Sequence, residues 1–297
     1  MENQQPTLSN WLTLIFLGAV WGSSFILMKK ALISFSASQV AGLRVAISFL
    51  VFFPFALRYL KKIPKEKWKY IAAVGALGSL FPAYLFAKAQ TQLDSAPAGI
   101  LNSLTPLFTF LWGISLFGQK GNLQRFLGIL LGFVGACLLI IDPNQGFSLN
   151  EYALLIVLAT ILYGLSGNVT KHYLQEVNPI HITAVSFFFV GLPALILLGS
   201  TDVVSVLQND PESWKALGYV SILSLGGTAL ALMLFWKLVQ DTDALFGAIV
   251  TYLIPIVAII WGIVDGESLQ LIQYFGFGLI LISVFLMGKK KATTKKP

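Results

Sequence analysis

The sequence has few charged residues and very little cysteine or histidine. Only 11% of its 297 residues are charged, against about 25% in a typical soluble domain, so the chain lacks the polar surface that a soluble protein needs. Its one cysteine, Cys137, cannot form an internal disulfide. Its two histidines, His172 and His181, have no further ligand at a metal-binding spacing. We therefore expect no disulfide framework, no metal site and no cofactor.

Acidic residues are missing from the apolar stretches of the chain. An intramembrane aspartyl protease would need two aspartates there, and a zinc protease would need a His-Glu-x-x-His motif, which the sequence does not contain. We therefore do not expect an enzyme. Proton-coupled carriers commonly use a buried carboxylate or histidine, so the same lack makes facilitated diffusion or solute exchange at least as plausible as proton coupling.

Hydrophobic residues are abundant, at 56% of the chain, and they occur in long runs. A helix needs roughly 20 apolar residues to cross a bilayer. The runs predict an all-α integral membrane protein, with the lipid bilayer as its main surrounding. The ten predicted transmembrane helices cover residues 10–29, 38–60, 69–90, 95–117, 123–141, 150–170, 179–199, 214–238, 243–264 and 270–288.

The net charge of +7 would fit a nucleic-acid partner, but the basic residues flank apolar segments instead of forming one face of a soluble domain. We therefore expect no nucleic-acid binding. Basic residues gather on the cytoplasmic side of membrane proteins. They predict that both termini are cytoplasmic in a multi-pass protein of the cytoplasmic (inner) membrane. The richest clusters are Arg58, Lys61, Lys62, Lys65, Lys67 and Lys69, and, in the tail, Lys289, Lys290, Lys291, Lys295 and Lys296.

An internal repeat divides the chain into residues 1–145 and residues 146–297. Each half contains five predicted spans, and because five is odd the second half must enter the membrane inverted. Inverted repeats around a central cavity recur in secondary transporters, although duplication for packing alone, as in a channel, would give the same pattern. A shift of 149 residues pairs Phe86 with Phe235, Asp94 with Asp243, Pro106 with Pro255 and Trp112 with Trp261, and a shift of 142 pairs Gly22 with Gly164, Ser24 with Ser166 and Lys29 with Lys171.

Several local motifs resemble those of one transporter family. The run Trp21-Gly22-Ser23-Ser24-Phe25, the charge of Arg44, and the stretch 98–112 with its Thr-Pro-Leu are similar to EamA-like proteins of the drug/metabolite transporter superfamily. Gln119 stands where that family usually has glutamate, whereas the second copy keeps Gly266-Glu267. The resemblance implies ten helices around a cavity and movement of small solutes, often export of amino acids or other metabolites.

Two prolines, Pro106 and Pro255, lie inside the fourth and ninth predicted spans. Proline cannot donate to the carbonyl four residues earlier, so each is expected to kink its helix and to free one carbonyl. Freed backbone groups at membrane depth must face protein or water. The polar side chains beside them are candidates for solute binding, although a kink closed by local hydrogen bonds is the alternative. These candidates are Asn102, Thr105, Thr251 and Tyr252.

Further candidates come from aromatic and small polar residues in other spans. Aromatic walls with few polar groups suit small organic solutes, but aromatic residues also pack and anchor membrane helices. The candidates are Trp21, Ser24, Phe81, Tyr84, Tyr163, Asn168 and Phe235.

Arg44 is the one charge clearly inside a predicted span. An intramembrane charge is costly, which makes it a functional candidate. Structural anchoring and a contact with solute or gate are equally compatible with its position. The sequence as a whole predicts a carrier that moves a small-molecule solute by alternating access. The alternatives are a facilitative channel or a non-transporting scaffold, and a homodimer is compatible with either.

Overall fold

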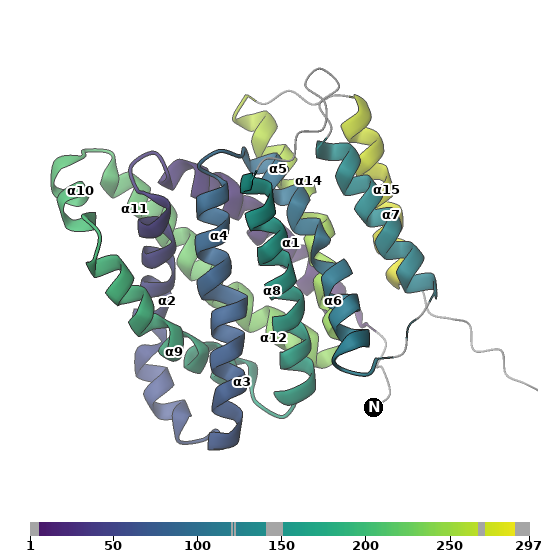
Figure 1. Ribbon diagram of the computed structural model, residues 1–297, viewed down its shortest axis with the longest axis horizontal. Coiled ribbons are helices and arrows are strands. Elements are labelled where there is room, and N and C mark those ends of the chain that lie inside the picture. The colour runs from purple at the N-terminus through teal and green to yellow at the C-terminus, as the bar shows by residue number, and fades with distance from the viewer. Residues whose placement is uncertain (1–5, 120, 122, 141–150, 267–270, 289–297) are drawn as a thin grey trace, which may run out of the picture.

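The computed structural model describes residues 6–119, 121, 123–140, 151–266 and 271–288, and every element in these ranges is helical. The helices stand side by side as one bundle (Figure 1). The predicted boundary between the halves at 145/146 and the basic tail at 289–297 lie outside the described residues.

Eight helical segments in the described ranges are long and apolar enough to cross a membrane, which agrees with a multi-pass membrane protein. Each coincides with a predicted span, with ends within a few residues. They are α1 (Leu8–Ala31), α2 (Ala37–Leu60), the composite α3–α4 (Lys65–Ala89), α5–α6 (Ser95–Ser115), α8 (Glu151–Tyr173), α9 (Pro179–Gly199), α11–α12 (Ser213–Asp241) and α13–α14 (Ala244–Val264).

The other two predicted spans correspond to α7 (Leu123–Ile140) and α15 (Leu271–Gly288), each an 18-residue helix. These two helices pack together at one flank of the bundle (Figure 1). A total of ten crossings therefore remains a prediction. One short helix, α10 (Val203–Asn209), was not predicted, because its residues lie between two apolar runs.

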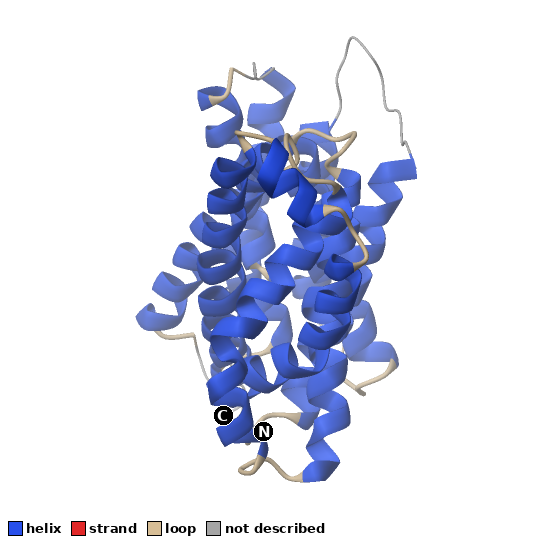
Figure 2. Cartoon of the chain, turned by 90° about the vertical axis from the view of Figure 1, so that its left-hand side faces the viewer, coloured by secondary structure: helices blue, strands red, loops and turns tan. Residues whose placement is uncertain are grey.

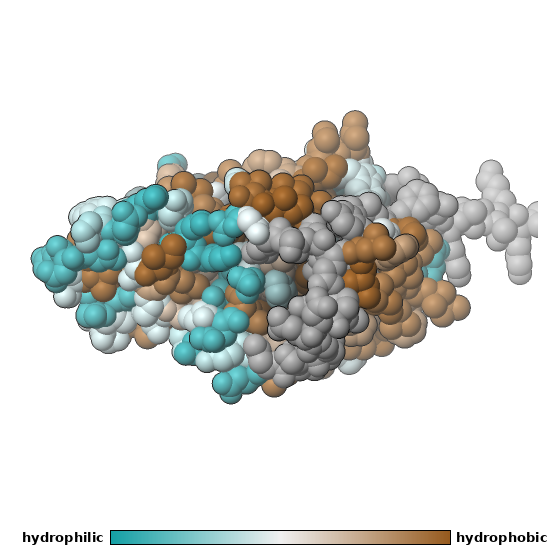
Figure 3. All heavy atoms as spheres, turned by 90° about the horizontal axis from the view of Figure 1, so that it is seen from above, coloured by the Kyte–Doolittle hydropathy of each residue, from teal (hydrophilic) through white to brown (hydrophobic). Residues whose placement is uncertain are grey.

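The helices alternate in direction, so the start of α1 and the end of α15 lie at the same end of the bundle (Figure 2). The opposite end carries α10. In a view onto that end, hydrophilic side chains gather over it, whereas hydrophobic ones form the flank where α7 and α15 stand (Figure 3). This distribution is typical of a protein whose sides face lipid.

Two composite spans contain a wide, π-helical turn. In the third span α3 (Lys65–Gly75) continues into η1 (Ala76–Leu80) and α4 (Phe81–Ala89). In the eighth span α11 (Ser213–Ile222) continues into η3 (Leu223–Leu230) and α12 (Ala231–Asp241). Such turns often occur at functional sites, because they disturb the regular hydrogen-bond ladder.

Two other spans are interrupted beside their prolines. In the fourth span α5 (Ser95–Leu101) gives way to the 3₁₀ turn η2 (Asn102–Leu104), after which α6 (Thr105–Ser115) begins with Pro106 near its start. In the ninth span α13 (Ala244–Ala248) is separated by Ile249 from α14 (Val250–Val264), which contains Pro255. The four interruptions lie at the level where the predicted cavity was expected.

The second helix of each half packs against its counterpart, α2 against α9. Phe52 stacks on Phe187 with ring centroids 6.0 Å apart. Gly191 allows the helices to approach closely, because a methyl group there would lie 2.2 Å from Cγ of Phe49. Small residues permit such approaches in membrane bundles. This contact joins the two halves beside the cavity.

Candidate functional site

A central cavity lies where the interrupted spans meet. It encloses about 880 Å³ of empty space, including the part that opens to solvent, and its wall is mainly apolar. A mainly apolar wall with a few polar groups is typical of sites for small organic molecules. Eight of the predicted site residues line it: Trp21, Ser24, Arg44, Asn102, Thr105, Tyr163, Phe235 and Thr251.

Two aromatic pairs form opposite parts of the wall. Trp21 of α1 meets Phe235 of α12 edge to face, with ring centroids 5.2 Å apart. Tyr163 of α8 stacks on Phe86 of α4 at 6.0 Å. The shifts that reveal the repeat relate Trp21 to Tyr163 and Phe235 to Phe86, so each half supplies one ring of each kind. The wall is therefore built from equivalent positions.

Two glycines of the π-helical turns contact serines of the first and sixth spans. A methyl group on Gly78 would lie 2.8 Å from Oγ of Ser166, and one on Gly227 would lie 2.8 Å from Oγ of Ser24. The indole N–H of Trp21 also donates to the carbonyl of Gly227 at 2.7 Å. The absence of side chains at both glycines thus lets the π-helical turns form part of the cavity wall.

The carbonyls that the prolines free are both occupied. The carbonyl of Asn102 accepts a hydrogen bond from the hydroxyl of Thr105 at 2.8 Å. The carbonyl of Thr251 accepts one from the hydroxyl of Ser103 at 3.0 Å, which links the fourth span to the ninth. Both freed carbonyls therefore already have hydrogen-bond partners in the protein, as the alternative of a hydrogen-bonded kink requires. The side chains of Asn102, Thr105 and Thr251 still line the cavity.

Phe81 and Tyr84 are not among the lining residues, although both were candidates. They are 52% and 40% exposed, on the outside of the bundle. On an α-helix with 3.6 residues per turn, they lie about 140° and 160° around the axis from Phe86, which does face the cavity. Aromatic content does not distinguish the two faces of this span, because the outward face is as aromatic as the inward one.

Tyr252 and Asn168 are buried but lie behind the wall. Tyr252 is fully buried and faces α7, since a methyl group on Gly132 would lie 2.6 Å from its Cζ. Asn168 donates through Nδ2 to the carbonyls of Thr109 and Gly164, both at 2.9 Å. Neither side chain lines the cavity, so both hold neighbouring helices together.

Several lining residues were not predicted. Ser166 could have been found, because the repeat pairs it with the candidate Ser24, and Phe86 pairs with the candidate Phe235. Thr228 carries no such signal, because only the π-helical turn brings it to the cavity. The lining residues absent from the prediction include Phe25, Met28, Phe86, Ser166, Thr228 and Trp236.

Arg44 enters the cavity wall from α2. Its Nε donates to the hydroxyl of Thr228 in η3 at 2.7 Å. The phenol of Tyr163 lies close enough to interact with it electrostatically. The arginine thus joins the first half to a π-helical turn of the second.

An ion cluster lies at the end of the bundle that carries α10. Lys29 at the end of α1 lies 3.4 Å from a carboxylate oxygen of Asp94 and 3.1 Å from one of Asp265. Lys30 approaches Asp265 to 2.6 Å. Hydrogen bonds from these two lysines, that of Lys30 first, lower the pKa of Asp265 below its usual value. Asp94 precedes α5 but makes no side-chain cap hydrogen bond there.

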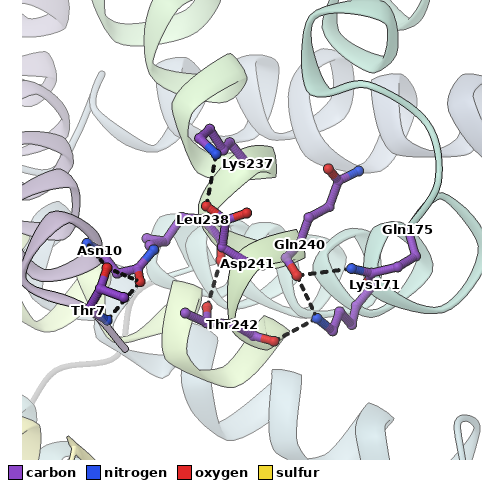
Figure 4. Close-up of polar contacts among 9 residues, drawn as sticks. All are labelled: Thr7, Asn10, Lys171, Gln175, Lys237, Leu238, Gln240, Asp241 and Thr242. Carbon is purple, nitrogen blue, oxygen red and sulfur yellow. Dashed lines mark hydrogen bonds and ion pairs between the residues drawn. The ribbon is translucent and has the colours of Figure 1, made fainter. Parts of the chain in front are cut away.

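Hydrogen bonds to backbone carbonyls are found at the other end of the bundle. The ammonium of Lys171 donates to the carbonyls of Gln240 and Thr242 at 2.9 and 2.6 Å (Figure 4). Gln240 in turn donates to the carbonyls of Leu174 and Val177 at 2.8 and 2.7 Å. Lys171 is the repeat equivalent of Lys29, but it donates hydrogen bonds to backbone carbonyls. Ion pairs are thus found at one end of the bundle, and hydrogen bonds from lysine to backbone carbonyls are found at the other.

Comparison with known proteins agrees with this architecture. The model of the EamA-like transporter family matches residues 9–141 and 150–289. The chain belongs to this family. The two matched stretches of this EamA-like protein correspond to the two predicted halves in position, and in the described residues no group of three or more metal-ligating side chains occurs.

Individual relatives cover nearly the whole chain. It is 28% identical to the "Uncharacterized transporter YvbV" of Bacillus subtilis, over 98% of this chain and 95% of that one. It is 24% identical to a "Probable amino-acid metabolite efflux pump" of Escherichia coli, over 90% of each. A solved crystal structure has the same fold, with a TM-score of 0.67 and 17% identity over 94% of this chain and 96% of the other. The protein is a multi-pass membrane transporter.

Proposed function

We propose that the protein is a secondary transporter that carries small metabolites, amino acids or related solutes, across the cytoplasmic membrane by alternating access. The observation that carries the proposal is the central cavity. Its wall combines Trp21 with Phe235 and Tyr163 with Phe86, residues that the repeat relates to one another. A site shared by two inverted halves is open to either side when the halves rock against each other.

The contacts at the two ends of the bundle support the same cycle. Lys29 with its carboxylates holds one end, and Lys171 with its carbonyl partners holds the other. Each set of contacts can break without disturbing the other, because they lie at opposite ends of the helices. A carrier needs such independent closures, whereas a channel needs a path that is open at both ends together.

Further observations bear on the direction of transport and on its driving force. The relative of Escherichia coli that carries the name of an efflux pump favours export. The charge distribution of the loops favours cytoplasmic termini. The residues found to line the cavity include no aspartate, glutamate or histidine, which favours facilitated diffusion or exchange over proton coupling.

Counterflow in proteoliposomes tests the proposal. Purified protein is reconstituted with a high internal concentration of one unlabelled solute, and entry of the same labelled solute is followed across a panel of amino acids and related metabolites. A carrier accumulates label transiently above equilibrium. A channel equilibrates the label without overshoot, and a scaffold gives no flux. Either of those results would reject the proposal.

A further inference from the structure

The charge balance of the cavity points to the chemistry of its solute. Arg44 is the only lining residue of an ionisable class other than tyrosine, since the identified wall contains no aspartate, glutamate, lysine or histidine. The ion pairs found among the described residues involve other basic side chains and lie toward the helix ends. The wall therefore carries one positive charge that no acidic side chain balances.

The guanidinium of Arg44 is held in place, but only part of its hydrogen-bonding capacity is used. Its Nε is bonded to Thr228. Within the described part of the chain, its two terminal nitrogens make no hydrogen bond. Both are accessible and not fully buried. Because Arg44 lines the cavity, these two terminal NH₂ groups are available to a ligand there. Thr228 is itself buried, 2% exposed, and fixes the direction of the fork.

A cation at this depth is costly unless an anion accompanies it. Arginine pairs most strongly with a planar carboxylate, which can accept two parallel hydrogen bonds from one guanidinium. A phosphate monoester carries nearly two negative charges at neutral pH and would leave one of them unmatched by a single arginine. The cavity wall as a whole is mainly apolar and includes several aromatic rings, and it suits the remainder of a small organic molecule.

We propose that the solute is a small organic acid with one carboxylate, which binds the terminal nitrogens of Arg44 while its apolar part lies against Trp21 and Phe235. This inference rests on the proposed transporter function. A free ammonium group on the solute is not required, because no acidic residue of the described wall would pair with it. The carboxylate thus selects the solute class, and the aromatic rings select its size.

Matched ligands test the inference on the unmodified protein. Quenching of tryptophan fluorescence, to which Trp21 contributes, is titrated with phenylacetate, phenylacetamide, phenethylamine and phenyl phosphate, which share one ring. Phenylacetate should bind about tenfold more tightly than the amide and the amine, the difference made by one charge-assisted pair. Equal affinities, preference for the amine, tighter binding of the phosphate, or no binding of phenylacetate would each overturn the inference.

Variants of Arg44 test whether this residue causes the preference for a carboxylate. In Arg44→Gln the preference for phenylacetate over phenylacetamide should disappear, whereas Arg44→Lys should restore part of it. Arg58→Gln is the matched control, since Arg58 lies on the same helix but is exposed at its end. If Arg44→Gln does not fold, Thr228→Val tests the same point by releasing the fork, and it should weaken phenylacetate but not the amide. An unchanged preference in the folded variants would overturn the assignment.

The two proposals fail in distinguishable ways. Carboxylate-selective binding without counterflow would reject the carrier and retain the site. Counterflow of amides or amines at the same rate as their matched acid would retain the carrier and reject the site.

Discussion

In the first half of the chain Gly22 of α1 packs against α14, and in the second half Gly164 of α8 packs against α6. The partners correspond as well, because Phe108 and Val257 occupy equivalent places of the repeat. The tryptophans behave alike: Trp112 donates to the carbonyl of Ile161, and Trp261 donates to a serine on α1. The packing frame of the two halves is thus nearly the same.

The charges of the two halves differ. The second span contains Arg44 in α2, whereas its counterpart α9 contains no lysine or arginine. Lys29 contacts carboxylates, whereas Lys171 bonds to carbonyls. In the proposed carrier, the shared packing would let both halves move in the same way, and the unequal charges would make the two ends of the bundle different. The proposal thus assigns movement to the repeated features and selectivity to the features that differ.

The largest expected effect is on the shared packing. Gly22→Ala and Gly164→Ala should each lower the free energy of unfolding by roughly 1–3 kcal/mol, the usual cost of overpacking. A methyl group at Gly164 would lie 2.7 Å from the backbone nitrogen of Thr109, and one at Gly22 would lie 2.9 Å from the carbonyl oxygen of Ile254. Thermal unfolding in detergent measures both.

Gly218→Ala is the control for these variants, because a methyl group there meets nothing within 4 Å. It should leave the melting temperature unchanged or raise it slightly. If only one of the two packed glycines is sensitive, the halves are not equivalent in packing.

An intermediate effect is expected at the aromatic pairs. Trp21→Ala and Tyr163→Ala should each weaken solute affinity by about tenfold, because each removes a large apolar contact from the wall. Transport kinetics in proteoliposomes should report the change as a raised KM. Phe81→Ala, on the outer face of α4, is the control and should leave the KM unchanged. Loss at only one of the two pairs would confine the solute to one half.

The smallest effect is expected at the two interrupted helices. Asn102→Ala and Thr251→Ala should each slow transport a fewfold, since each removes one polar group worth about 1 kcal/mol from the wall. The backbone kinks should persist, because their hydrogen bonds come from Thr105 and Ser103. Unchanged kinetics in both variants, with protein still folded, would remove these side chains from the solute site.

The sequence is informative about this fold because apolar length and repeat spacing are strong signals. It places eight apolar helices, the two prolines, and the pair Phe86 and Phe235. Apolarity alone cannot separate Phe86 from Phe81, because in a bilayer the lipid-facing side of a helix is as apolar as its inner side, and only the repeat spacing marks Phe86. It also cannot place Thr228, since a π-helical turn changes the register of every residue after it.

The carboxylate closure has a defined pH dependence. Because its lysine partners lower the pKa of Asp265, its contribution to the closed end is present above the ordinary pKa of an aspartate and is lost only as pH falls through the lowered value. Closure of this end should therefore persist across neutral and mildly acidic pH. The neutral substitution Asp265→Asn should open it at any pH.

Accessibility of one cavity residue from each side tests alternating access most directly. A cysteine is placed by Ser24→Cys in a Cys137→Ser background, and its labelling by an impermeant reagent is timed from either face of sealed vesicles. We expect labelling from both faces, with Asp265→Asn raising the rate on one face and lowering it on the other, and Lys171→Met doing the reverse. If either variant raises both rates together, or if labelling occurs from one face only in every variant, alternating access is contradicted.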